Sequence, residues 1–434
     1  MAPSRTESPW PSTPRHPRAE AGTGWYPVAR SADVGTTPQP VGAGGQAYVV
    51  LRLRPGAEVT ALSARCPHRL VPLTAATVVD GRVQCPYHGW QFNAEGRCVE
   101  IPSLGPVGAP PPRADLSTPW AVEERDGWVW LAPDLTPTSR PPRATSPTPE
   151  PVPDLPQPDG PVLDNLHPAL EHAWHPVALT GELRAGGYVQ TRLLGRTWTV
   201  HRRPGGALDA DPPAWGVAEH LGVVWIAPAQ PQVELIDVPG PADPLTLSAW
   251  LPPVRSVAPA GLLADAFLDA SHRSLVAPAS PDATAPEVTH DRHGSTGVHE
   301  EPGRRVTHVH RAPFQLLRRV EDLATGAVTT VLRLLQPEDA DSTRVHTRVL
   351  LHRPDGSADA DALAAAVESA AASLAEDLAL LPRLASSGLP LLPRDELHVR
   401  ADRLGVALRR TLADLVADCA ARDRAAALEQ RATA

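Results

Sequence analysis

The stretch CPHRLVPLTAATVVDGRVQCPYHGW, residues 66 to 90, contains two short cysteine–histidine motifs. Cys66 and His68 form a C-x-H pair, and Cys85 and His88 form a C-x-x-H pair after sixteen intervening residues. Thiolate and imidazole together bind zinc or an iron–sulfur cluster. A zinc finger usually keeps its thiols in one knuckle and its histidines in another, whereas here each motif supplies one of each. This division favours a two-iron cluster in which one iron takes two thiolates and the other two imidazoles.

These residues resemble the Rieske [2Fe–2S] motif, C-P-H-R followed by C-x-Y-H-G-W. The resemblance implies that Cys66 and Cys85 bind the iron that stays ferric, and that His68 and His88 bind the iron that accepts the electron. Neutral imidazoles make the cluster less negative, which raises its reduction potential. Gly89 permits a tight backbone turn after His88. A structural zinc site and four unrelated residues are the alternatives.

The composition narrows the class of protein. The 434-residue chain has a formal net charge of −9 and no lysine, which argues against nucleic-acid binding because that normally shows as a basic patch. No apolar run approaches the roughly 18 residues of a membrane helix, and the N-terminus lacks the apolar region of a signal peptide. Apart from Cys66 and Cys85 there are only Cys98 and Cys419, so no disulfide framework is expected. We expect a soluble, cytoplasmic protein without a membrane or nucleic-acid partner.

The motifs lie inside a β-rich segment that is bounded by proline-rich sequence. Residues 1–22 are rich in proline and poor in aliphatic side chains, so we expect disorder. Residues 23–134 are expected to form the Rieske [2Fe–2S] domain, with a strand at 47–53 and a closing hairpin around Asp126-Gly127. Residues 135–160 contain so much proline that we expect an extended linker.

After this linker the sequence echoes the first domain. The segment WHPVA (174–178) repeats WYPVA (25–29), and WGVAEHLGVVWIAP (215–228) repeats WAVEERDGWVWLAP (120–133). No cysteine lies between 174 and 228. We therefore expect residues 161–235 to form a degenerate, metal-free Rieske-like β domain; chance similarity of two hairpins is the alternative.

Three histidines lie near the start of that second copy, namely His167, His172 and His175. His175 occupies the place of Tyr26 in the first copy. We interpret it as a surface residue at the start of a strand rather than as a metal ligand.

For residues 236–434 the sequence predicts a helix, then several strands and then long helices. Strands are expected at 304–314, 327–337 and 343–353, which are rich in β-branched residues, and Ala- and Leu-rich helices at about 359–385 and 402–430. This order resembles the catalytic domain of Rieske-type ring-hydroxylating and demethylating oxygenases, an antiparallel sheet around a long helix. The expected fold class is α+β.

In that family the catalytic domain holds a mononuclear non-haem Fe(II) bound by two histidines and one carboxylate. Asp269 and His272 match the family's Asp-x-x-His, but the second histidine is missing and Ala277 stands in its region. Asp265, Asp269 and His272 share one face of a helix. That polar face is a metal-binding face or a solvated face, and we favour the former.

The third iron ligand is expected on the helix at about 359–385, where Asp377 falls on the apolar stripe. A buried carboxylate is costly unless it is paired or binds a metal, and the surrounding residues resemble the family segment that supplies this ligand. The alternative is a salt bridge to an arginine. The missing ligand could be replaced by Asp265, or by His290, His293 or His299 from the loop that follows.

The leading hypothesis is a Rieske-type oxygenase component with a [2Fe–2S] cluster and a mononuclear Fe(II). It would receive electrons from a separate reductase or ferredoxin and use O2 to hydroxylate or demethylate a small organic substrate. The resemblance also implies a homotrimer, in which Asp269 connects the cluster histidine of one subunit to the iron histidine of the next. The alternative is a non-catalytic electron-transfer or scaffolding subunit that keeps the cluster and has lost the mononuclear iron. A simple ferredoxin would leave the rest of the chain without a role.

Overall fold

The computed structural model of the chain describes residues 23–105, 107–144, 146–155, 158–240, 243–269, 285–357, 359–381 and 386–433. The segment predicted to be disordered (1–22) and the residues His272 and Ala277 lie outside the described residues.

The first part of the chain forms a small β sandwich, which we call the first sandwich. Its sheets have the strand orders β1-β10-β9 and β2-β3-β4, and a four-stranded sheet β5-β6-β7-β8 carries the cysteine–histidine loops. The strands are β1 (Tyr26–Arg30), β2 (Gln39–Ala43), β3 (Gln46–Arg52), β4 (Val59–Ser63), β5 (Thr77–Val79), β6 (Arg82–Gln84), β7 (Gln91–Phe92), β8 (Cys98–Glu100), β9 (Ala121–Arg125) and β10 (Trp128–Ala132).

A second sandwich repeats the outer strands of the first. Its sheets have the orders β12-β17-β16 and β13-β14-β15, so the first strand again pairs with the last. Both pairings also contain a bulge at the same place, between Pro27 and Ala29 and between Pro176 and Ala178. The strands are β12 (His175–Leu179), β13 (Tyr188–Leu193), β14 (Arg196–Arg202), β15 (Leu208–Asp211), β16 (Gly216–His220) and β17 (Val223–Ala227).

The equivalent tryptophans of the two copies have equivalent partners. The indole of Trp130 donates to the carbonyl of Arg125 at 3.4 Å, and that of Trp225 donates to the carbonyl of His220 at 3.1 Å. Strand order, bulge and indole contact all follow the pattern that the sequence repeat predicts. The domain boundaries themselves remain a prediction.

The structure corrects the interpretation of His175. It is fully buried at the start of β12 and not at the surface, and its Nε2 donates to the carbonyl of Leu170 at 2.7 Å. Burial lowers the pKa of His175 to about 4. The first copy has Tyr26 in this place, which is only half-buried, so the repeat gave no signal of the difference.

The C-terminal part is built on an eight-stranded antiparallel sheet. Its order is β18-β25-β24-β23-β22-β21-β20, with β19 also paired to β25. The strands are β18 (Thr246–Trp250), β19 (Val254–Ser256), β20 (Glu287–Asp291), β21 (Gly294–Glu301), β22 (Arg304–Arg311), β23 (Gln315–Asp322), β24 (Val328–Asp339) and β25 (Ser342–His352). The three strands and the α+β class predicted for this region are confirmed.

The sequence predicts a loop after the first helix, but the described part of this stretch contains two strands. Its described part forms the hairpin β20–β21, which turns at Asp291 to Gly294. The alternation of side chains in this stretch was hidden by its many polar residues, which carried no clear apolar period.

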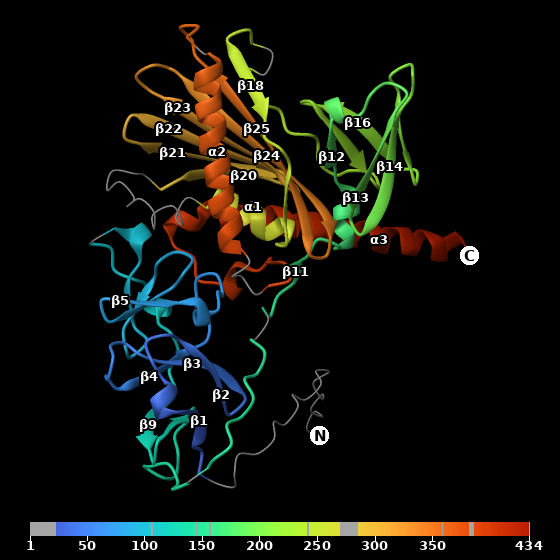
Figure 1. Cartoon of the computed structure of the whole chain (residues 1–434). Helices are drawn as coiled ribbons and strands as arrows, with labels where there is room; N and C mark the ends of the chain where they lie inside the picture. The colour runs from blue at the N-terminus through green and yellow to red at the C-terminus, as the bar shows by residue number, and fades with distance from the viewer. Residues whose placement is uncertain are drawn as a thin grey trace, which may run out of the picture.

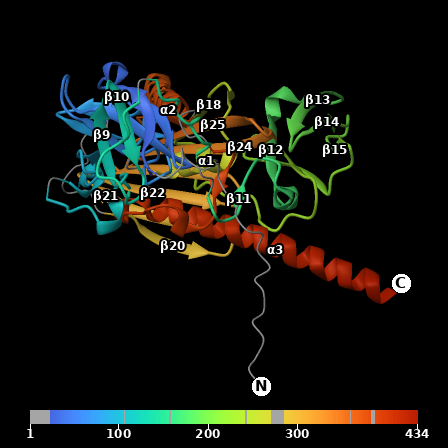
Figure 2. The same cartoon turned by 90° about the horizontal axis from the view of Figure 1, so that it is seen from below.

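In the described part of the chain, three α-helices accompany the sheet. Helix α2 lies across one face of it, and α1 and α3 run along its lower end (Figure 1). In Figure 2, α3 passes beneath the sheet and ends beyond the second sandwich. None of the helices in the described ranges is long and apolar enough to cross a membrane. The helices are α1 (Ala260–Leu268), α2 (Ala360–Leu380) and α3 (Arg403–Thr433).

The two sandwiches contact different parts of this C-terminal unit. The second sandwich packs Val223 and Trp225 against Leu317, Leu332 and Leu334, on the sheet face opposite α2. The first sandwich lies below the sheet, next to the ends of α1 and α3 (Figure 1). Between the sandwiches, a two-stranded sheet pairs β11 (Val162–Leu163) with β26 (Leu389–Pro390).

Candidate metal centre

The two cysteine–histidine motifs form loops of the same backbone design, which we call the ligand loops (66–71 and 85–90). In each loop the cysteine N–H donates to the carbonyl five residues later, Cys66 to Val71 and Cys85 to Trp90, both at 2.9 Å. The fifth residue of each loop has a left-handed backbone, Leu70 with φ 54° and Gly89 with φ 70°. The turn predicted at Gly89 is therefore present, and its counterpart places a leucine in a conformation that favours glycine.

The ligand loops bring both thiols together in a buried position. Backbone N–H groups also point at them, from His68 to Cys66 and from Tyr87 and His88 to Cys85. Burial and contact with Cys85 raise the pKa of Cys66, whereas the hydrogen bond from Cys66 lowers the pKa of Cys85. Amide donors around the two sulfurs favour their thiolate form.

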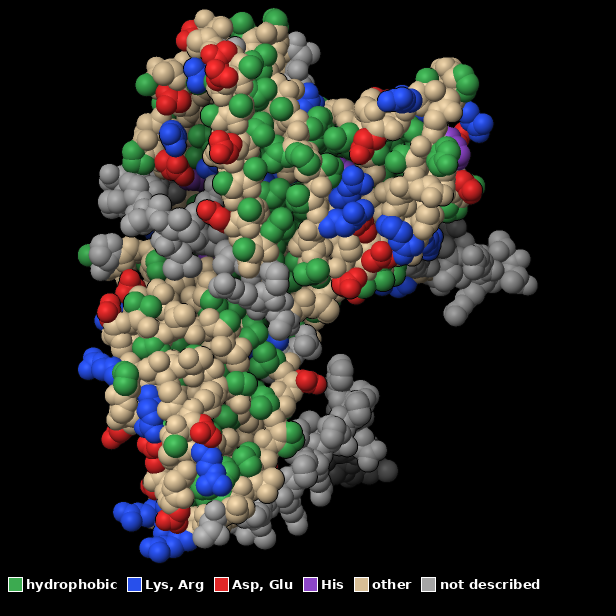
Figure 3. Space-filling model, viewed as in Figure 1, with side chains coloured by type: hydrophobic (Ala, Val, Ile, Leu, Met, Phe, Trp, Pro, Cys, Tyr) green, Lys and Arg blue, Asp and Glu red, His purple; other side chains and the backbone are tan. Residues whose placement is uncertain are grey.

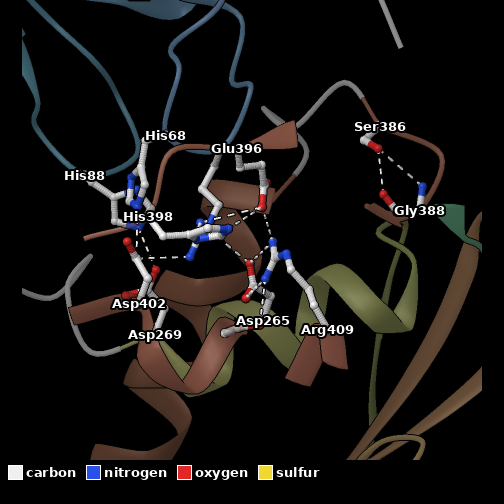
Figure 4. Close-up of polar contacts among 12 residues, drawn as sticks. His68, His88, Asp265, Asp269, Ser386, Gly388, Glu396, His398, Asp402 and Arg409 are labelled. Atoms are coloured by element: carbon white, nitrogen blue, oxygen red, sulfur yellow. Dashed lines mark hydrogen bonds and ion pairs between the residues drawn. The ribbon is translucent and has the colours of Figure 1, made fainter. Parts of the chain in front are cut away.

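The two imidazoles lie beside each other, with ring centroids 4.3 Å apart. The His68 ring also stacks on Trp90, at 4.6 Å and 10°. Each imidazole contacts a buried carboxylate: His68 Nε2 lies 2.9 Å from Asp402 Oδ1, and His88 Nε2 lies 2.8 Å from Asp269 Oδ2 (Figure 4). Since an ionised carboxylate only accepts, both Nε2 atoms donate.

With Nε2 donating, the neutral form of either ring has on Nδ1 the lone pair that a metal needs. Nδ1 of His68 is buried and has no hydrogen-bond partner among the described residues. Burial lowers the pKa of His68 to about 4, so the ring is neutral at pH 7. Two thiols and two oriented imidazoles within one buried pocket fit a [2Fe–2S] cluster of the Rieske type. When bound, such a cluster supplies one-electron transfer.

Across the described ranges, no three His, Cys, Asp or Glu side chains are placed to hold a single metal ion. The ligand loops do not conflict with this, because each iron of a Rieske cluster takes two protein ligands rather than three.

A buried ion network joins the ligand loops to the C-terminal part of the chain (Figure 4). Arg69 lies 3.0 Å from Asp402, 3.3 Å from Asp265 and 3.6 Å from Glu396. Arg409 of α3 pairs with Asp265 at 2.6 Å and with Glu396 at 2.7 Å. Burial would raise the pKa of Asp402, but Arg69 and His68 hold it below its usual value. Asp265 and Asp402 therefore stay charged although they are buried, whereas burial raises the pKa of Glu396.

This network overturns one expectation for the iron site. Asp265 was a candidate replacement for the missing iron ligand, but both of its oxygens bind Arg409. The polar helix face that contains Asp265 and Asp269 is therefore not solvated in its described part, and a metal-binding role of this face through His272 remains a prediction. This face binds an arginine and a cluster-loop histidine.

Asp269 directly follows α1 and caps it, so its carboxylate points away from the helix end toward His88. The resemblance implied that this contact would connect two subunits. In the structure His88 and Asp269 contact each other within one chain. The connection between subunits that the resemblance implied remains a prediction.

Asp377 is buried on α2, as its place on the apolar stripe predicted. Its Oδ2 accepts from Arg333 Nη1 at 3.0 Å, and the Arg333 guanidinium lies 4.3 Å from the centre of the Phe267 ring. The salt bridge that the sequence left open is thus present. Its other predicted partner, His272, lies outside the described residues, so a role of Asp377 in iron binding remains a prediction.

The three histidines proposed as substitutes lie on the β20–β21 hairpin. His290 is exposed and lies 3.9 Å from Asp414 of α3, and His293 lies at the turn of the hairpin. His299 is buried, and its ring stacks on His308 with centroids 5.7 Å apart. His299 is therefore the one of the three that approaches the interior of the sheet.

A cavity of about 440 Å³ lies between the sheet and α2. Phe267 and Leu268 of α1 line it, as do Arg333 and Ser373. Asp269 is the next residue along the chain, so the cavity lies close to the part of α1 that contacts the ligand loops.

Sequence reasoning missed Asp402, Glu396 and Arg409. Asp402 Oδ2 accepts from the N–H of Val399 at 2.5 Å at the start of α3, and an aspartate before a helix is a recognisable capping signal. Nothing in the sequence indicates that the same carboxylate also binds His68.

Two family models match the chain. The Rieske [2Fe-2S] domain matches residues 24–111, and the vanillate O-demethylase oxygenase C-terminal domain matches residues 281–418. Together they contain three of the four chain segments that the site uses: the ligand loops, Asp377 and the start of α3.

Curated relatives match a limited part of the chain. Protein TIC 55 of Arabidopsis thaliana is 37% identical over 113 residues, 25% of this chain and 20% of that protein. The dicamba O-demethylase oxygenase component of Stenotrophomonas maltophilia is 39% identical over 85 residues, 20% of this chain and 24% of that protein. The matches thus cover about a fifth to a quarter of these relatives.

Among solved structures, NdmA of Pseudomonas putida CBB5 is 17% identical, with 89% of this chain and 88% of that chain covered at a TM-score of 0.38. The two family models and the geometry of the ligand loops agree on one assignment. The chain belongs to the Rieske-type oxygenases, with a Rieske [2Fe–2S] domain joined to an oxygenase C-terminal domain of the vanillate O-demethylase type.

Proposed function

We propose that the protein is the oxygenase component of a Rieske-type system. It receives electrons from a separate reductase or ferredoxin and uses O2 to hydroxylate or demethylate a small organic substrate. The observation that carries this proposal is the 2.8 Å contact between His88 and Asp269. It connects a cluster ligand directly to the helix on which the oxygenase family places its iron histidines.

In the structure this contact lies within one chain. His88 and His68 both bind carboxylates of their own C-terminal part, and Arg69 adds the ion network. We therefore propose that the ligand loops serve the catalytic-type domain of the same chain. The proline-rich segment 135–160 is long enough to allow this docking. A homotrimer and a cytoplasmic location, both expected from the sequence, are compatible with this proposal and remain predictions.

Asp269 and Asp402 are placed to hold the two histidines in the orientation that cluster binding needs. Asp269 and Asp402 orient the imidazoles and keep each Nε2 protonated, so that Nδ1 is directed to the cluster side. Burial of both carboxylates excludes water from the interface. The loops are thereby fixed relative to α1 by hydrogen bonds at both histidines.

The second candidate function is a subunit that keeps the cluster and lacks the mononuclear iron. Two observations favour it: Ala277 stands where the family has a histidine, and Arg333 occupies the carboxylate of Asp377. An arginine that pairs with a carboxylate competes with a metal ion for the same negatively charged oxygens. The retained Asp269, His272 and Asp377 favour the oxygenase.

Nitric oxide separates these candidates, because it binds an Fe(II) that has an open position and gives a high-spin EPR signal distinct from that of the cluster. The oxygenase proposal predicts three irons per chain and this signal in protein reconstituted with Fe(II). His272→Ala should abolish the signal and leave the cluster spectrum unchanged. Two irons per chain without a nitric oxide signal would support the electron-transfer subunit instead.

Restoring the missing ligand provides a matched gain-of-function variant. Ala277→His should raise the occupancy of the mononuclear iron if the helix presents this position to the site. His293→Ala, at the turn of the β20–β21 hairpin, serves as the control and should change neither the iron content nor the signal.

A further inference from the structure

The buried ion network contains more carboxylates than guanidinium groups. Arg69 and Arg409 are its two cations, and Asp265, Glu396 and Asp402 are the three carboxylates around them. All five side chains are at most 5% exposed. The acidic side chains visible in Figure 3 lie at the surface, where water solvates them. In the buried network, by contrast, one negative charge is in excess when all three carboxylates are ionised.

The three carboxylates of the network are not held equally well. Asp265 accepts two hydrogen bonds from Arg409, at 2.6 and 3.0 Å, and Asp402 is hydrogen-bonded to His68 at 2.9 Å. Glu396 Oε2 lies 2.7 Å from Arg409 Nη2, but within the described residues it has no contact with the angles of a hydrogen bond. Burial raises the pKa of Glu396. Glu396 is therefore the carboxylate whose charged form the network stabilises least.

Glu396 lies two contacts away from a cluster ligand. His68 binds Asp402, and Arg69 lies between Asp402 and Glu396, 3.0 Å from the first and 3.6 Å from the second. The side chains of His68, Asp402 and Glu396 lie close together in Figure 4. An electron on the cluster adds a negative charge beside a network that already has an excess carboxylate. Because charges interact strongly where water is excluded, this electron raises the proton affinity of the carboxylate that is held least well.

A small cavity lies beside this carboxylate. Its volume is about 20 Å³, and its lining includes Glu396, Asp265, Tyr87 and Ser386. A water molecule needs roughly 10–15 Å³ of such space and two to four polar partners. The cavity therefore has room for one water molecule next to Glu396, which gives this buried carboxylate a route to a proton.

The other ionisable groups near Glu396 do not remove the excess negative charge. His398 Nε2 lies 4.0 Å from Glu396, and its Nδ1 contacts Arg69 at 2.9 Å. Burial and the neighbouring arginines lower the pKa of His398 to about 3, so this imidazole is neutral at pH 7. Arg65 lines the small cavity, and Asp269 lies at the end of α1. The charges of these last two side chains are opposite and offset each other.

We propose that Glu396 takes up one proton when the cluster gains one electron. The electron comes from the one-electron donor and stays on the cluster, whereas the proton comes from solvent through the small cavity and forms an O–H bond on the Glu396 carboxylate. The net charge of the buried interface is then the same before and after reduction. Because binding free energies are reciprocal, protonation of Glu396 and reduction of the cluster favour each other to the same extent. This inference concerns the cluster and does not depend on the mononuclear iron.

The test is the reduction potential of the cluster as a function of pH, measured by circular dichroism during titration with dithionite and mediator dyes. In a window above 4.5, the ordinary pKa of a glutamate, the potential should fall with rising pH by up to about 59 mV per pH unit, the value for one proton per electron. Glu396→Gln keeps the shape of the side chain but cannot be protonated, so its potential should not depend on pH in this window. Glu396→Asp keeps a carboxyl group and should retain a pH-dependent potential.

Glu100→Gln is the matched control. Glu100 is an exposed residue of β8 in the same domain, and it pairs with the exposed Arg82 at 3.3 Å. Its substitution should leave the pH dependence of the potential unchanged. Two results would overturn the proposal: a wild-type potential that does not vary with pH in this window, and an equal pH dependence in Glu396→Gln, which would place the proton on another group.

Infrared spectroscopy tests the same proposal on the unaltered protein. The difference spectrum between reduced and oxidised protein should show the C=O band of a new carboxylic acid, which shifts in D2O, and the loss of a carboxylate band. The absence of these changes would refute the proposal even if Glu396→Gln bound no cluster. The nitric oxide experiment is independent of this measurement. A nitric oxide signal without the carboxylic acid band would refute the role of Glu396 and leave the oxygenase function intact.

Discussion

His68 and Asp402 are separated by 334 positions in the sequence, yet His68 Nε2 lies 2.9 Å from Asp402 Oδ1 in a fully buried contact. Asp402 directly precedes the helix α3 and at the same time contacts the ring of a predicted cluster ligand. Together with the contact between His88 and Asp269 it gives both cluster histidines a carboxylate from the C-terminal part. The Rieske domain and the oxygenase-type domain are thus joined at the ligands themselves.

The buried ion network should be essential to this interface. Asp265→Ala removes both carboxylate oxygens that α1 supplies to the Arg409 guanidinium, and should lower the free energy of unfolding by about 3–5 kcal/mol because two buried arginines, Arg409 and Arg69, each lose one ion-pair partner. Arg292→Ala breaks an exposed pair with Asp418 and should cost less than about 1 kcal/mol. Urea unfolding of the two variants measures both losses of stability. Equal losses would show that the buried network stabilises the fold no more than an exposed ion pair does.

The two ligand loops should differ in their tolerance of substitution. Gly89→Ala places a side chain on a residue with φ 70° and should cost about 1–2 kcal/mol. Leu70→Gly relieves the same conformation at φ 54° but loses a leucine contact, so the net change should stay below about 1 kcal/mol. Iron and sulfide content and thermal unfolding measure both effects. A larger loss for Leu70→Gly than for Gly89→Ala would contradict the backbone argument.

His175 should make the protein sensitive to acid. Its pKa is lowered from 6.5 to about 4 by burial, so between these values the unfolded chain binds a proton that the folded chain does not. Stability therefore falls as the pH decreases through this window, by about 2 kcal/mol for this group between pH 7.5 and 5. His175→Gln should reduce the pH dependence of the unfolding free energy by that amount. An unchanged pH profile in His175→Gln would show that the imidazole is not buried in solution.

The cluster prediction concerns ligand identity. Reduced protein should give a rhombic EPR spectrum, with two irons and two sulfides in the cluster, because two imidazoles bind one of the irons. His88→Cys should shift the spectrum toward an all-thiolate cluster or lose it. Trp120→Ala, an exposed residue of the same domain, should leave it unchanged. Recovery of zinc without sulfide would exclude the assignment.

Local patterns predicted the local parts of the fold. The ligand loops could be predicted because four ligands and one glycine stand at fixed spacing. The strands β22, β24 and β25 could be predicted from their β-branched content. The repeat of β12 and β17 was readable because the same letters recur at both ends of the sandwich. Asp377 was predicted to be buried because it interrupts an apolar stripe.

The contacts between distant segments could not be predicted in this way. Nothing near Asp265 in the sequence indicates that Arg409 and Arg69 pair with it, because the pairing depends on how the first sandwich docks. His175 showed no signal of burial, since its equivalent in the first copy is a half-buried tyrosine. The salt bridge to an arginine, which was the alternative for Asp377, is present. The sequence could not identify Arg333 as the partner, because the chain has many arginines.

The central claim is that the Rieske domain docks on the C-terminal domain of its own chain. Equimolar ¹⁴N- and ¹⁵N-labelled chains, refolded or exchanged together, can be crosslinked with a carboxyl-reactive dihydrazide, since the protein has no lysine. Mass spectrometry then shows whether links between residues 23–134 and 285–433 join peptides of one isotope or of both. The account predicts links within a single isotope, in proportion far above random pairing. Mixed-isotope links at the random proportion would place the His88–Asp269 contact between chains and contradict it.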